Sequence, residues 1–368
     1  MKNLIKWSVL LINEVIIMLL FSYKKVRVLK DTIILVRLDN IGDFIIWLHS
    51  LKNLKNESKN KKIILVCNKV FEELAIESKI FDEIIGIDVK KFNLNLVYKY
   101  KVLKKLRINK YEKLISPIYS RNVATEGIVK NILATEKVGI NGDTSNITKY
   151  QQKFTNKNYT KLIEIESKNK MQLYINIEFF NKVFNTNYKI ELYNWNKNKK
   201  RNNSYKNYCI FFLGASTIKK CWEVEKYAEI IKKIPKNLEI LLCGGKQEKV
   251  LGEKIISLIK EHKIKNLIGK TNLIEVLKLI KESNFIVCND TFAVHMAVML
   301  RKKSICIVGG GHFGRFLPYP KELEDNEDNF LPKVIYKKMD CFGCNWKCKY
   351  STIPYKCIKN IKVKDVIL

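Results

Sequence analysis

Proline, glycine and arginine are scarce in this chain of 368 residues, which contains six prolines, 15 glycines and seven arginines. So little proline and glycine excludes a collagen-like chain and a low-complexity Pro/Gly sequence. Hydrophobic residues make up 47% of the chain and aromatic residues 11%, which excludes a mostly disordered chain because that much apolar surface can form a core. The length allows two domains of ordinary size.

Lysine carries nearly all of the positive charge. The 68 basic residues comprise 61 lysines and 7 arginines, against 36 acidic residues, so the formal net charge is +32. The lysines are spread through every segment instead of gathering on one element. We interpret them as a compositional bias that favours anionic partners, an anionic membrane surface among them. They do not indicate a nucleic-acid-binding protein, so we expect no nucleic-acid partner.

The ten cysteines fall into two groups. Six are scattered, mostly in apolar runs where a free thiol is buried like a small hydrophobic group, and their usage suits a reducing cytoplasm: Cys67, Cys209, Cys221, Cys243, Cys288 and Cys306. The other four lie near the C-terminus at a spacing compatible with a zinc or iron–sulfur site: Cys341, Cys344, Cys348 and Cys357. We favour reduced packing cysteines or disulfides over a structural metal at these four.

Residues 7–23 form the most apolar run, and basic residues flank it on both sides. Glu14 at the centre of the run makes a membrane span costly, by about 2.5–3.5 kcal/mol on insertion scales. No small-residue cleavage site of a signal peptide follows. A core or subunit-contact helix is one alternative and a true span is another. We expect the segment to lie in an anionic membrane surface and to attach the chain peripherally.

Strand-like and helix-like patterns alternate along the rest of the chain. The run 32–38 is apolar and β-branched, as in a strand buried on both faces, and a helical pattern follows it. A second alternating series begins at residue 208, whereas the polar stretch 141–170 has little periodicity and is interpreted as a loop or an insertion. The alternation predicts an α/β fold with two doubly wound, Rossmann-like domains facing each other across a cleft.

Five segments follow from this organisation: an apolar extension (1–30), an N-terminal domain (31–193), a polar linker (194–207), a C-terminal domain (208–340) and a cysteine-containing tail (341–368). Ligands of doubly wound sheets bind beyond the carboxyl ends of the strands. The turns that follow the strands are therefore the places to look for site residues.

The first such turn is Arg37-Leu-Asp-Asn-Ile-Gly-Asp43. Asp39 and Asp43 flank it, and Asp43 stands where the next helix begins. An aspartate there can simply cap the helix and offset its dipole. A carboxylate in a cleft between domains can also act as a general base. Local chemistry leaves both interpretations open.

Two further turns belong to the second series. In Gly214-Ala-Ser-Thr-Ile-Lys-Lys-Cys-Trp222, hydroxyl groups, backbone N–H groups and a lysine suit a phosphate, although Ser and Thr before a helix are also ordinary caps. In Asn289-Asp-Thr-Phe-Ala-Val-His295, the histidine lies four residues after Thr291 on the same helix face. A lone histidine on an apolar helix is usually structural, but beside an Asp-Thr turn it is a credible ligand for a nucleotide diphosphate or a ribose.

Gly309, Gly311 and Gly314 spell the dinucleotide pattern G-x-G-x-x-G after a strand. That pattern indicates a cofactor loop only where a helix opens at once. Prolines at 318 and 320 follow instead, so we exclude a Rossmann cofactor loop here.

In this order and spacing, the motifs resemble the lipopolysaccharide heptosyltransferases, glycosyltransferase family 9, over residues 32–368. The R-L-D-N-I-G-D, G-A-S…K-x-W, L-L-C-G-G and N-D-T…H-M-A elements carry the resemblance, and the cysteine tail is similar to that of the second-heptose branch. The resemblance implies a GT-B fold, no metal or other cofactor, and inverting transfer of a sugar from a nucleotide diphosphate donor such as ADP-heptose. The implied acceptor is a lipopolysaccharide core or a related lipid-linked glycan, with the acceptor on the N-terminal domain and the nucleotide on the C-terminal one.

The resemblance also implies residue roles. Asp43 corresponds to the general base that deprotonates the acceptor hydroxyl, and Lys220 to the lysine that neutralises the donor diphosphate. Phe292 stands where the family has glycine. The further donor contacts are Ser216, Thr217, Asp290, Thr291 and His295. The acceptor-side candidates are Arg37, Asp39 and Asn40.

Two alternatives stay open. One is a family relative that uses another nucleotide sugar or another glycan acceptor. The other is a non-catalytic GT-B-like binding module, against which the presence of Asp43, Lys220, Asp290 and His295 argues. We expect an enzyme of the cytoplasm that lies peripherally on the inner face of the cytoplasmic membrane.

Overall fold

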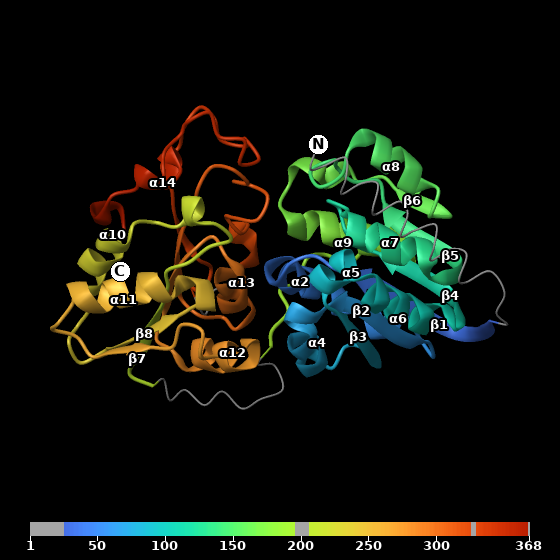
Figure 1. Ribbon diagram of the computed structural model, residues 1–368, viewed down its shortest axis with the longest axis horizontal. Helices are drawn as coiled ribbons and strands as arrows, with labels where there is room; N and C mark the ends of the chain where they lie inside the picture. Colours follow the sequence, from blue (N-terminus) through green and yellow to red (C-terminus); the bar gives the residue numbers. More distant parts are fainter. Residues whose placement is uncertain (1–25, 196–205, 325–328, 367–368) are drawn as a thin grey trace. The chain divides into compact units, whose positions relative to one another are not determined.

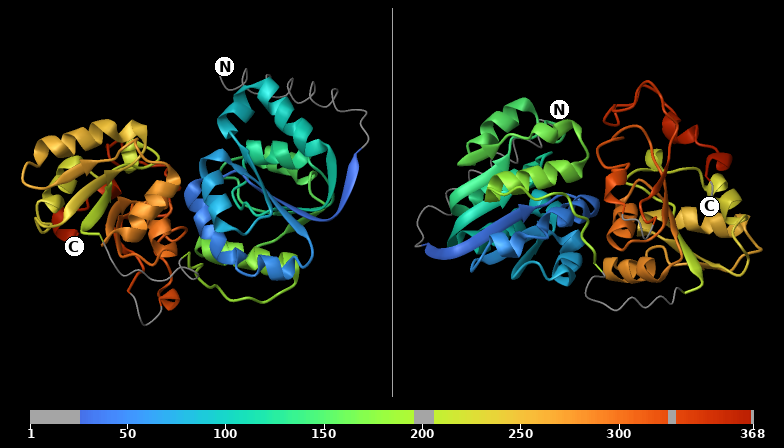
Figure 2. Two further views of the ribbon diagram at one scale, coloured as in Figure 1. Left: turned by 90° about the horizontal axis from the view of Figure 1, so that it is seen from below. Right: turned by 180° about the vertical axis from the view of Figure 1, so that it is seen from behind.

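Two six-stranded parallel sheets organise the computed structural model, which describes residues 26–195, 206–324 and 329–366 (Figure 1). Helices cover both faces of each sheet (Figure 2). Every strand pairing within the two sheets is parallel, as expected for strands that are joined by helical crossovers. The predicted α/β class with two doubly wound units is confirmed.

The first sheet has the strand order β3-β2-β1-β4-β5-β6. Its strands are β1 (Arg27–Arg37), β2 (Lys62–Asn68), β3 (Glu83–Ile87), β4 (Asn109–Ser116), β5 (Leu133–Ile140) and β6 (Lys161–Ile163). The helices of this half of the chain are α2 (Ile41–Leu48), α3 (Leu54–Glu57), α4 (Glu72–Ser78), α5 (Val89–Leu94), α6 (Leu96–Arg107), α7 (Val123–Asn131), α8 (Lys149–Asn156) and α9 (Gln172–Phe184). The chain reverses its direction across the sheet between β1 and β4, which makes their carboxyl ends a topological switch point.

The second sheet has the order β12-β11-β10-β7-β8-β9. Its strands are β7 (Tyr208–Phe212), β8 (Glu239–Cys243), β9 (Ile264–Asn266), β10 (Ile286–Asn289), β11 (Ser304–Ile307) and β12 (Lys333–Ile335). Its helices are α10 (Val224–Ile231), α11 (Lys249–Leu258), α12 (Leu273–Glu282), α13 (Phe292–Met299) and α14 (Lys356–Lys359). The switch point of this sheet lies between β7 and β10.

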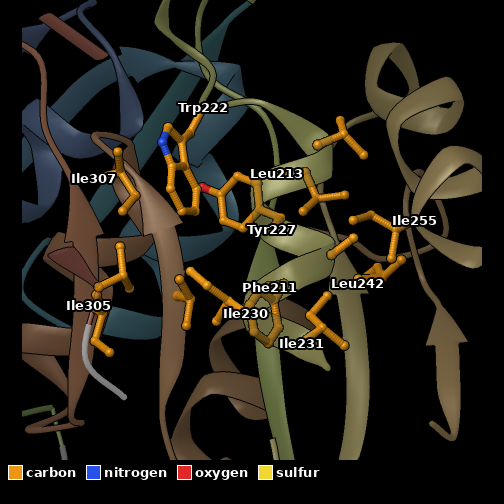
Figure 3. Packing of buried hydrophobic residues seen from close by; sticks show 14 of the residues in the cluster. Phe211, Leu213, Trp222, Tyr227, Ile230, Ile231, Leu242, Ile255, Ile305 and Ile307 are labelled. Carbon is orange, nitrogen blue, oxygen red and sulfur yellow. The ribbon is translucent and has the colours of Figure 1, made fainter. Parts of the chain in front are cut away.

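Aromatic side chains anchor the core of the second sheet (Figure 3). The Tyr227 ring meets the Trp222 ring edge to face, with 5.1 Å between the ring centroids, and meets Phe211 in the same way at 6.2 Å. The indole nitrogen of Trp222 donates to the main-chain oxygen of Ile361 at 3.0 Å. Trp222 therefore joins the turn after β7 to the end of the chain while it fills the core.

The chain packs as two compact units, and their boundaries differ from the division of the chain between the two sheets. The second unit includes residues 41–52 and 167–177 in addition to everything from Tyr188 onward. Helix α2 therefore follows β1 in the chain but groups with α13 in packing. The five segments expected from the sequence stay a prediction.

The stretch 141–170 is more regular than its sequence indicates. It holds α8, β6 and a short 3₁₀ helix at Glu166–Asn169. Helix α8 contributes no buried residue, so the apolar periodicity that reveals a helix is missing from its sequence.

The apolar run 7–23 lies outside the described residues. In the described part of the chain, no helix combines the length and the hydropathy that crossing a membrane requires.

A buried asparagine at the end of β10 holds the neighbouring turn in place. The Asn289 amide donates to the main-chain oxygens of Leu213 and Gly214, at 2.8 and 3.1 Å, and its oxygen accepts from the Trp222 N–H at 2.9 Å. One side chain thus satisfies three main-chain groups between β7 and α10.

We expect Asn289→Ala to lower the free energy of unfolding by about 2–4 kcal/mol, because buried main-chain groups lose their partner. Asn284 provides the control: its side chain is exposed, so Asn284→Ala should stay within about 0.5 kcal/mol of the parent. Urea unfolding measures both. Equal unfolding midpoints for the two variants would contradict the role of Asn289.

Candidate functional site

The loops after β7, β8, β10 and β11 meet at the carboxyl edge of the second sheet, because the carboxyl ends of parallel strands share one edge. The loop after β7 leads into the 3₁₀ helix η4 (Ile218–Lys220), and the loop after β10 leads into α13. Asn289 ties these two loops together through Leu213 and Gly214. The donor candidates predicted from the sequence all lie on these two loops or on the first turn and a half of α13.

Lys220 and Asp290 form the electrostatic centre of this edge. Burial raises the pKa of Asp290 to about 6, the nearby Lys220 charge opposes that rise, and the negative charge of Asp43 adds to it. Burial also lowers the pKa of Lys220, and Asp290 opposes that shift. The two side chains therefore stabilise each other's charge at a place where water is partly excluded, and charges act strongly there.

Asp43 reaches the same centre from α2. Its carboxylate is half-buried in the first turn of the helix, and its charge acts on both Asp290 and His312. Gly42 allows the close approach of α2 to α13, because a Cβ atom there would lie 3.3 Å from Cδ2 of His295. The structure therefore brings Asp43 together with Lys220 and Asp290 within one compact unit.

His295 is enclosed by the protein. It is 4% exposed, and its Nδ1 lies 2.9 Å from the Tyr319 hydroxyl. Burial lowers its pKa to about 3, so the ring is neutral at neutral pH. These contacts give His295 a role in packing α13 against α2, and its contact with a donor stays a prediction.

Of the three hydroxyl side chains predicted to contact the donor, two hydrogen-bond to main-chain N–H groups at helix starts and one is exposed. Thr217 accepts from the N–H of Lys219 at 3.3 Å, and Thr291 caps α13 through the N–H of Ala293 at 3.4 Å. Ser216 is exposed beside Thr217. The two threonines thus shape the turns, while Ser216 is accessible to a ligand.

Phe292, which stands where the family has glycine, opens α13. Its ring packs edge to face on Phe212, with 6.3 Å between the centroids. Its bulk is thus accommodated against the end of β7.

The acceptor-side candidates belong to the first unit. The Arg37 guanidinium is buried and pairs with both carboxylate oxygens of Asp39, at 3.0 and 2.7 Å, and it donates to the Pro117 oxygen at 3.3 Å. The pair therefore braces the ends of β1 and β4 at the switch point. Asn40 is exposed next to it. All three stay acceptor-side predictions.

The sequence analysis missed His312, which follows the glycines of the loop after β11. Its Nε2 pairs with the Asn345 side chain, and the charges of Lys220 and Asp43 both act on its pKa, which burial lowers. No helix opens directly after Gly314 in the described residues, as expected from the prolines. The position of this loop could have identified His312 from the sequence, because the loop follows a strand that lies next to β10 in the second sheet.

The C-terminal tail covers that glycine loop. A Cβ atom at Gly310 would lie 2.2 Å from the Phe342 ring, and one at Gly311 would lie 2.3 Å from the Trp346 ring. The Trp346 ring in turn lies under the Lys220 ammonium group, 4.2 Å from nitrogen to ring centroid. The glycines thus serve close packing of aromatic rings, and the tail holds Lys220 by a cation–π contact.

The four tail cysteines are free thiols. Cys357 is buried and accepts from the Gly310 N–H at 3.4 Å, a contact typical of a packing cysteine. Within residues 26–195, 206–324 and 329–366, no group of three or more His, Cys, Asp or Glu side chains is placed to hold a metal ion.

Glu248 is a second residue that the sequence analysis missed. It ends the 3₁₀ helix η5 (Lys246–Glu248) after β8, and its Oε2 accepts from the Gly245 N–H at 3.0 Å. Cβ atoms at Gly214 or Gly244 would lie 2.0 and 1.8 Å from its carboxyl group, so the glycines make room for it. Burial raises its pKa. Glu248 could have been identified from the sequence as an acidic residue just after the glycines that end a strand.

Comparison with known proteins decides the family. Residues 99–342 match the model of glycosyltransferase family 9 (heptosyltransferase). The chain belongs to this family. The resemblance inferred from the motifs is confirmed, and the matched residues of this heptosyltransferase-family chain include Lys220, Asp290 and His312.

Two curated relatives are lipooligosaccharide heptosyltransferases 2 from Campylobacter jejuni subsp. jejuni, of serotypes O:6 and O:2, and their name agrees with the second-heptose branch. Each is 27% identical over 154 residues. The match covers 40% of this chain and 45% of the serotype O:6 protein, so it spans less than half of the relative.

Solved structures share the fold. The E. coli heptosyltransferase WaaC with ADP-2-deoxy-2-fluoro heptose has a TM-score of 0.64 at 15% identity, over 82% of this chain and 92% of the other. The E. coli ADP-heptose lps heptosyltransferase II has a TM-score of 0.63 at 15% identity, over 91% and 96%. The GT-B type of the fold is thereby confirmed.

Two buried neutral histidines in the second unit predict acid sensitivity. His49 is 3% exposed, and its Nδ1 accepts from the Tyr193 N–H at 2.8 Å. Burial, with His295 adding to the effect, lowers its pKa to about 3, and the His295 pKa is also about 3. Both folded-state pKa values lie below the unfolded value of about 6.5, so the unfolded chain binds more protons as the pH falls.

We expect each histidine to lower the free energy of unfolding below about pH 6.5, by about 1.4 kcal/mol per pH unit, while protonation of Asp290 below its raised pKa of about 6 offsets part of that loss. His49→Asn keeps a hydrogen-bond acceptor without the titration, so it should remove about half of the histidine contribution to that slope. Urea midpoints between pH 7.5 and 5 measure it. A slope that His49→Asn leaves unchanged would contradict the assignment.

Proposed function

We propose that this chain is an inverting glycosyltransferase that moves a heptose-like sugar from a nucleotide diphosphate donor to a hydroxyl group of a lipopolysaccharide core or a related surface glycan. Family membership supports the reaction class. The observation that carries the proposal is the grouping of Asp43, Lys220 and Asp290 at one partly dehydrated sheet edge. It supplies a carboxylate base and a cation for the leaving group, the two charges that such a transfer needs.

The donor binds at the carboxyl edge of the second sheet. Lys220 neutralises the diphosphate, with Ser216, Thr217, Thr291 and backbone N–H groups at the start of α13 as further contacts. Trp346 holds the lysine ammonium group in place through the cation–π contact. An ADP-heptose-like donor is proposed because related solved structures carry ADP and an ADP-heptose analogue in their names.

Two acidic residues complete the donor site. Glu248 lies after the second strand of this sheet, where an acidic residue of a doubly wound fold typically accepts hydrogen bonds from ribose hydroxyls. Asp290 pairs electrostatically with Lys220, so it orients the lysine toward the phosphates. His295 packs α13 against α2 and is a further proposed donor contact.

The reaction proceeds by displacement at the anomeric carbon. The Asp43 carboxylate takes the proton of the acceptor hydroxyl while that oxygen attacks the anomeric carbon. The bond from this carbon to the diphosphate oxygen breaks on the opposite face, so the configuration inverts. The leaving nucleoside diphosphate keeps the electron pair, and Lys220 and backbone N–H groups stabilise its negative charge.

The acceptor is a lipid-linked glycan, with Arg37, Asp39 and Asn40 as acceptor-side residues at the switch point of the first sheet. The enzyme works in the cytoplasm, peripherally on the inner face of the cytoplasmic membrane. The formal net charge of +32 and the basic flanks of residues 7–23 support attraction to anionic lipid head groups.

Replacing the base should abolish most of the turnover without unfolding the protein. We expect Asp43→Asn to lower turnover by roughly 10²–10⁴-fold, because the proton acceptor is lost while its shape is kept. The melting temperature should barely change, since Asn serves a helix start about as well as Asp. Loss of the Asp43 charge should also lower the pKa of Asp290.

The matched control for that substitution is Asp88→Asn, because Asp88 caps α5 by accepting from the Lys91 N–H at 2.9 Å. It should leave both turnover and melting temperature native. Near-native turnover in a stable Asp43→Asn protein would mean that Asp43 only serves the helix.

Removing the donor lysine should weaken nucleotide binding. We expect Lys220→Ala to reduce the affinity for a nucleoside diphosphate at least about tenfold, because a charge-assisted contact is lost. Lys219→Ala is the control, since this exposed neighbour lies over Tyr355, 5.9 Å from its ring centroid. Isothermal calorimetry with ADP measures both variants, and equal affinities would remove Lys220 from the site.

A thermal-shift panel of ADP-, UDP- and GDP-sugars on the parent protein identifies the donor. A donor at 100 times its Kd should stabilise the protein by roughly 2.7 kcal/mol.

A further inference from the structure

Helix α8 of the first unit is amphipathic, but its polar side faces the protein and its aromatic side faces solvent. Gln151, Gln152, Thr155 and Asn156 form its less exposed side, whereas its aromatic residues face solvent. Helices of globular proteins normally turn their apolar stripe to the core. This arrangement leaves the apolar side of α8 without a partner in the described chain.

Polar contacts hold the inner side of α8 in place. The Gln152 amide donates to the Gly142 oxygen at 2.7 Å, and the Asn156 side chain accepts from the fully buried Arg121. The Thr155 hydroxyl donates to the main-chain oxygen of Gln152 at 3.2 Å, within the helix. Because Arg121 is part of the interior of the first unit, its contact with Asn156 fixes which side of α8 faces the protein.

The outer side combines two aromatic rings with lysines. Tyr150 is 88% exposed and Phe154 63% exposed, and they are four residues apart, on one face. Lys149, Lys153 and Lys157 are exposed on the same side, and the segment 149–157 contains no acidic residue. We call these five residues the α8 face.

We propose that the α8 face docks the protein on an anionic phospholipid bilayer. The rings enter the interfacial region, and the lysines bind the phosphate groups above them. Charge complementarity selects this occupant, because three cations around two rings repel a second copy of the same face. Lysines also extend their charged ends toward water or phosphate while their aliphatic stems cover apolar surface.

The position of α8 agrees with this role. It lies between β5 and the edge strand β6, at the edge of the first unit (Figure 1, green). The inference rests on the proposed membrane location, and it adds an attachment point on α8 to the one expected from the sequence at residues 7–23.

Vesicle binding of the full chain tests the proposal. The probes are vesicles of phosphatidylglycerol and phosphatidylethanolamine, with pure phosphatidylcholine as the neutral control. We expect the double variant Tyr150→Ser/Phe154→Ser to lower the partition coefficient on anionic vesicles at least about tenfold, because inserted aromatic surface is lost. Each substitution of an α8-face lysine by glutamine should lower it about fivefold.

A matched control comes from the second unit, where Val250 is 72% exposed on α11. Val250→Ser should leave the partition coefficient unchanged. Tryptophan fluorescence at position 154 measures insertion directly. The variant is Phe154→Trp combined with Trp7→Phe, the second substitution removing the tryptophan of the apolar run. Brominated lipids should then quench additional fluorescence relative to the Trp7→Phe protein.

The outcomes separate this inference from the proposed reaction. Melting temperature, ADP affinity and transfer to a lipid-free acceptor should stay native in the Tyr150→Ser/Phe154→Ser variant, since the α8 face takes no part in chemistry. Unchanged partitioning together with no quenching at position 154 would overturn the proposal. So would a dimer in sedimentation analysis that this double variant dissociates, because the face would then bind a second copy. Vesicle binding is measured whether or not sugar transfer is detected.

Discussion

The amide of Asn289 is the constraint on which the second unit depends. Its side chain satisfies main-chain groups of Leu213, Gly214 and Trp222, so the turn after β7 is held at the end of β10. Parallel strands place their carboxyl ends at one edge but do not determine the path of the loops beyond them. The asparagine does so for the two loops that carry Lys220 and Asp290. A packing requirement of the interior thus positions the charges of the candidate site.

Those charges are kept effective by limited access to water. Lys220 and Asp290 shift each other's pKa against the effect of burial, so each stabilises the charged form of the other. Trp346 covers the lysine, and the glycines of the loop after β11 allow the aromatic tail to approach. The cysteine-containing tail therefore acts as a wall of the site, and its thiols contribute packing through contacts such as Cys357 with Gly310.

The two units use polar groups in opposite ways. In the second unit, the buried Asn289 orders the charged edge of the proposed donor site. In the first unit, the buried Arg121 binds Asn156 on the polar side of α8, which leaves Tyr150 and Phe154 in solvent. Buried ionic groups require partners, and Asn156 of α8 is one of the partners of Arg121. The apolar rings are exposed as a consequence, which gives the first unit a surface suited to an interface.

The sequence by itself determined the family and the two α/β units, because strand-end motifs such as Arg37–Asp43 and Asn289–His295 occur in a set order between β-branched runs. The family resemblance also assigned Lys220 and Asp290 to one predicted donor site, on turns that follow strands of the second α/β series. Only the tertiary structure decided that α2 packs with α13, that His312 and Trp346 border Lys220, and that His295 is enclosed. The local sequence pattern indicates backbone preference and burial, but it carries no information on these contacts, because they join residues that are far apart in the chain. The helix α8 escaped detection for a related reason: its inner side is polar, so the apolar period on which sequence reading relies is absent.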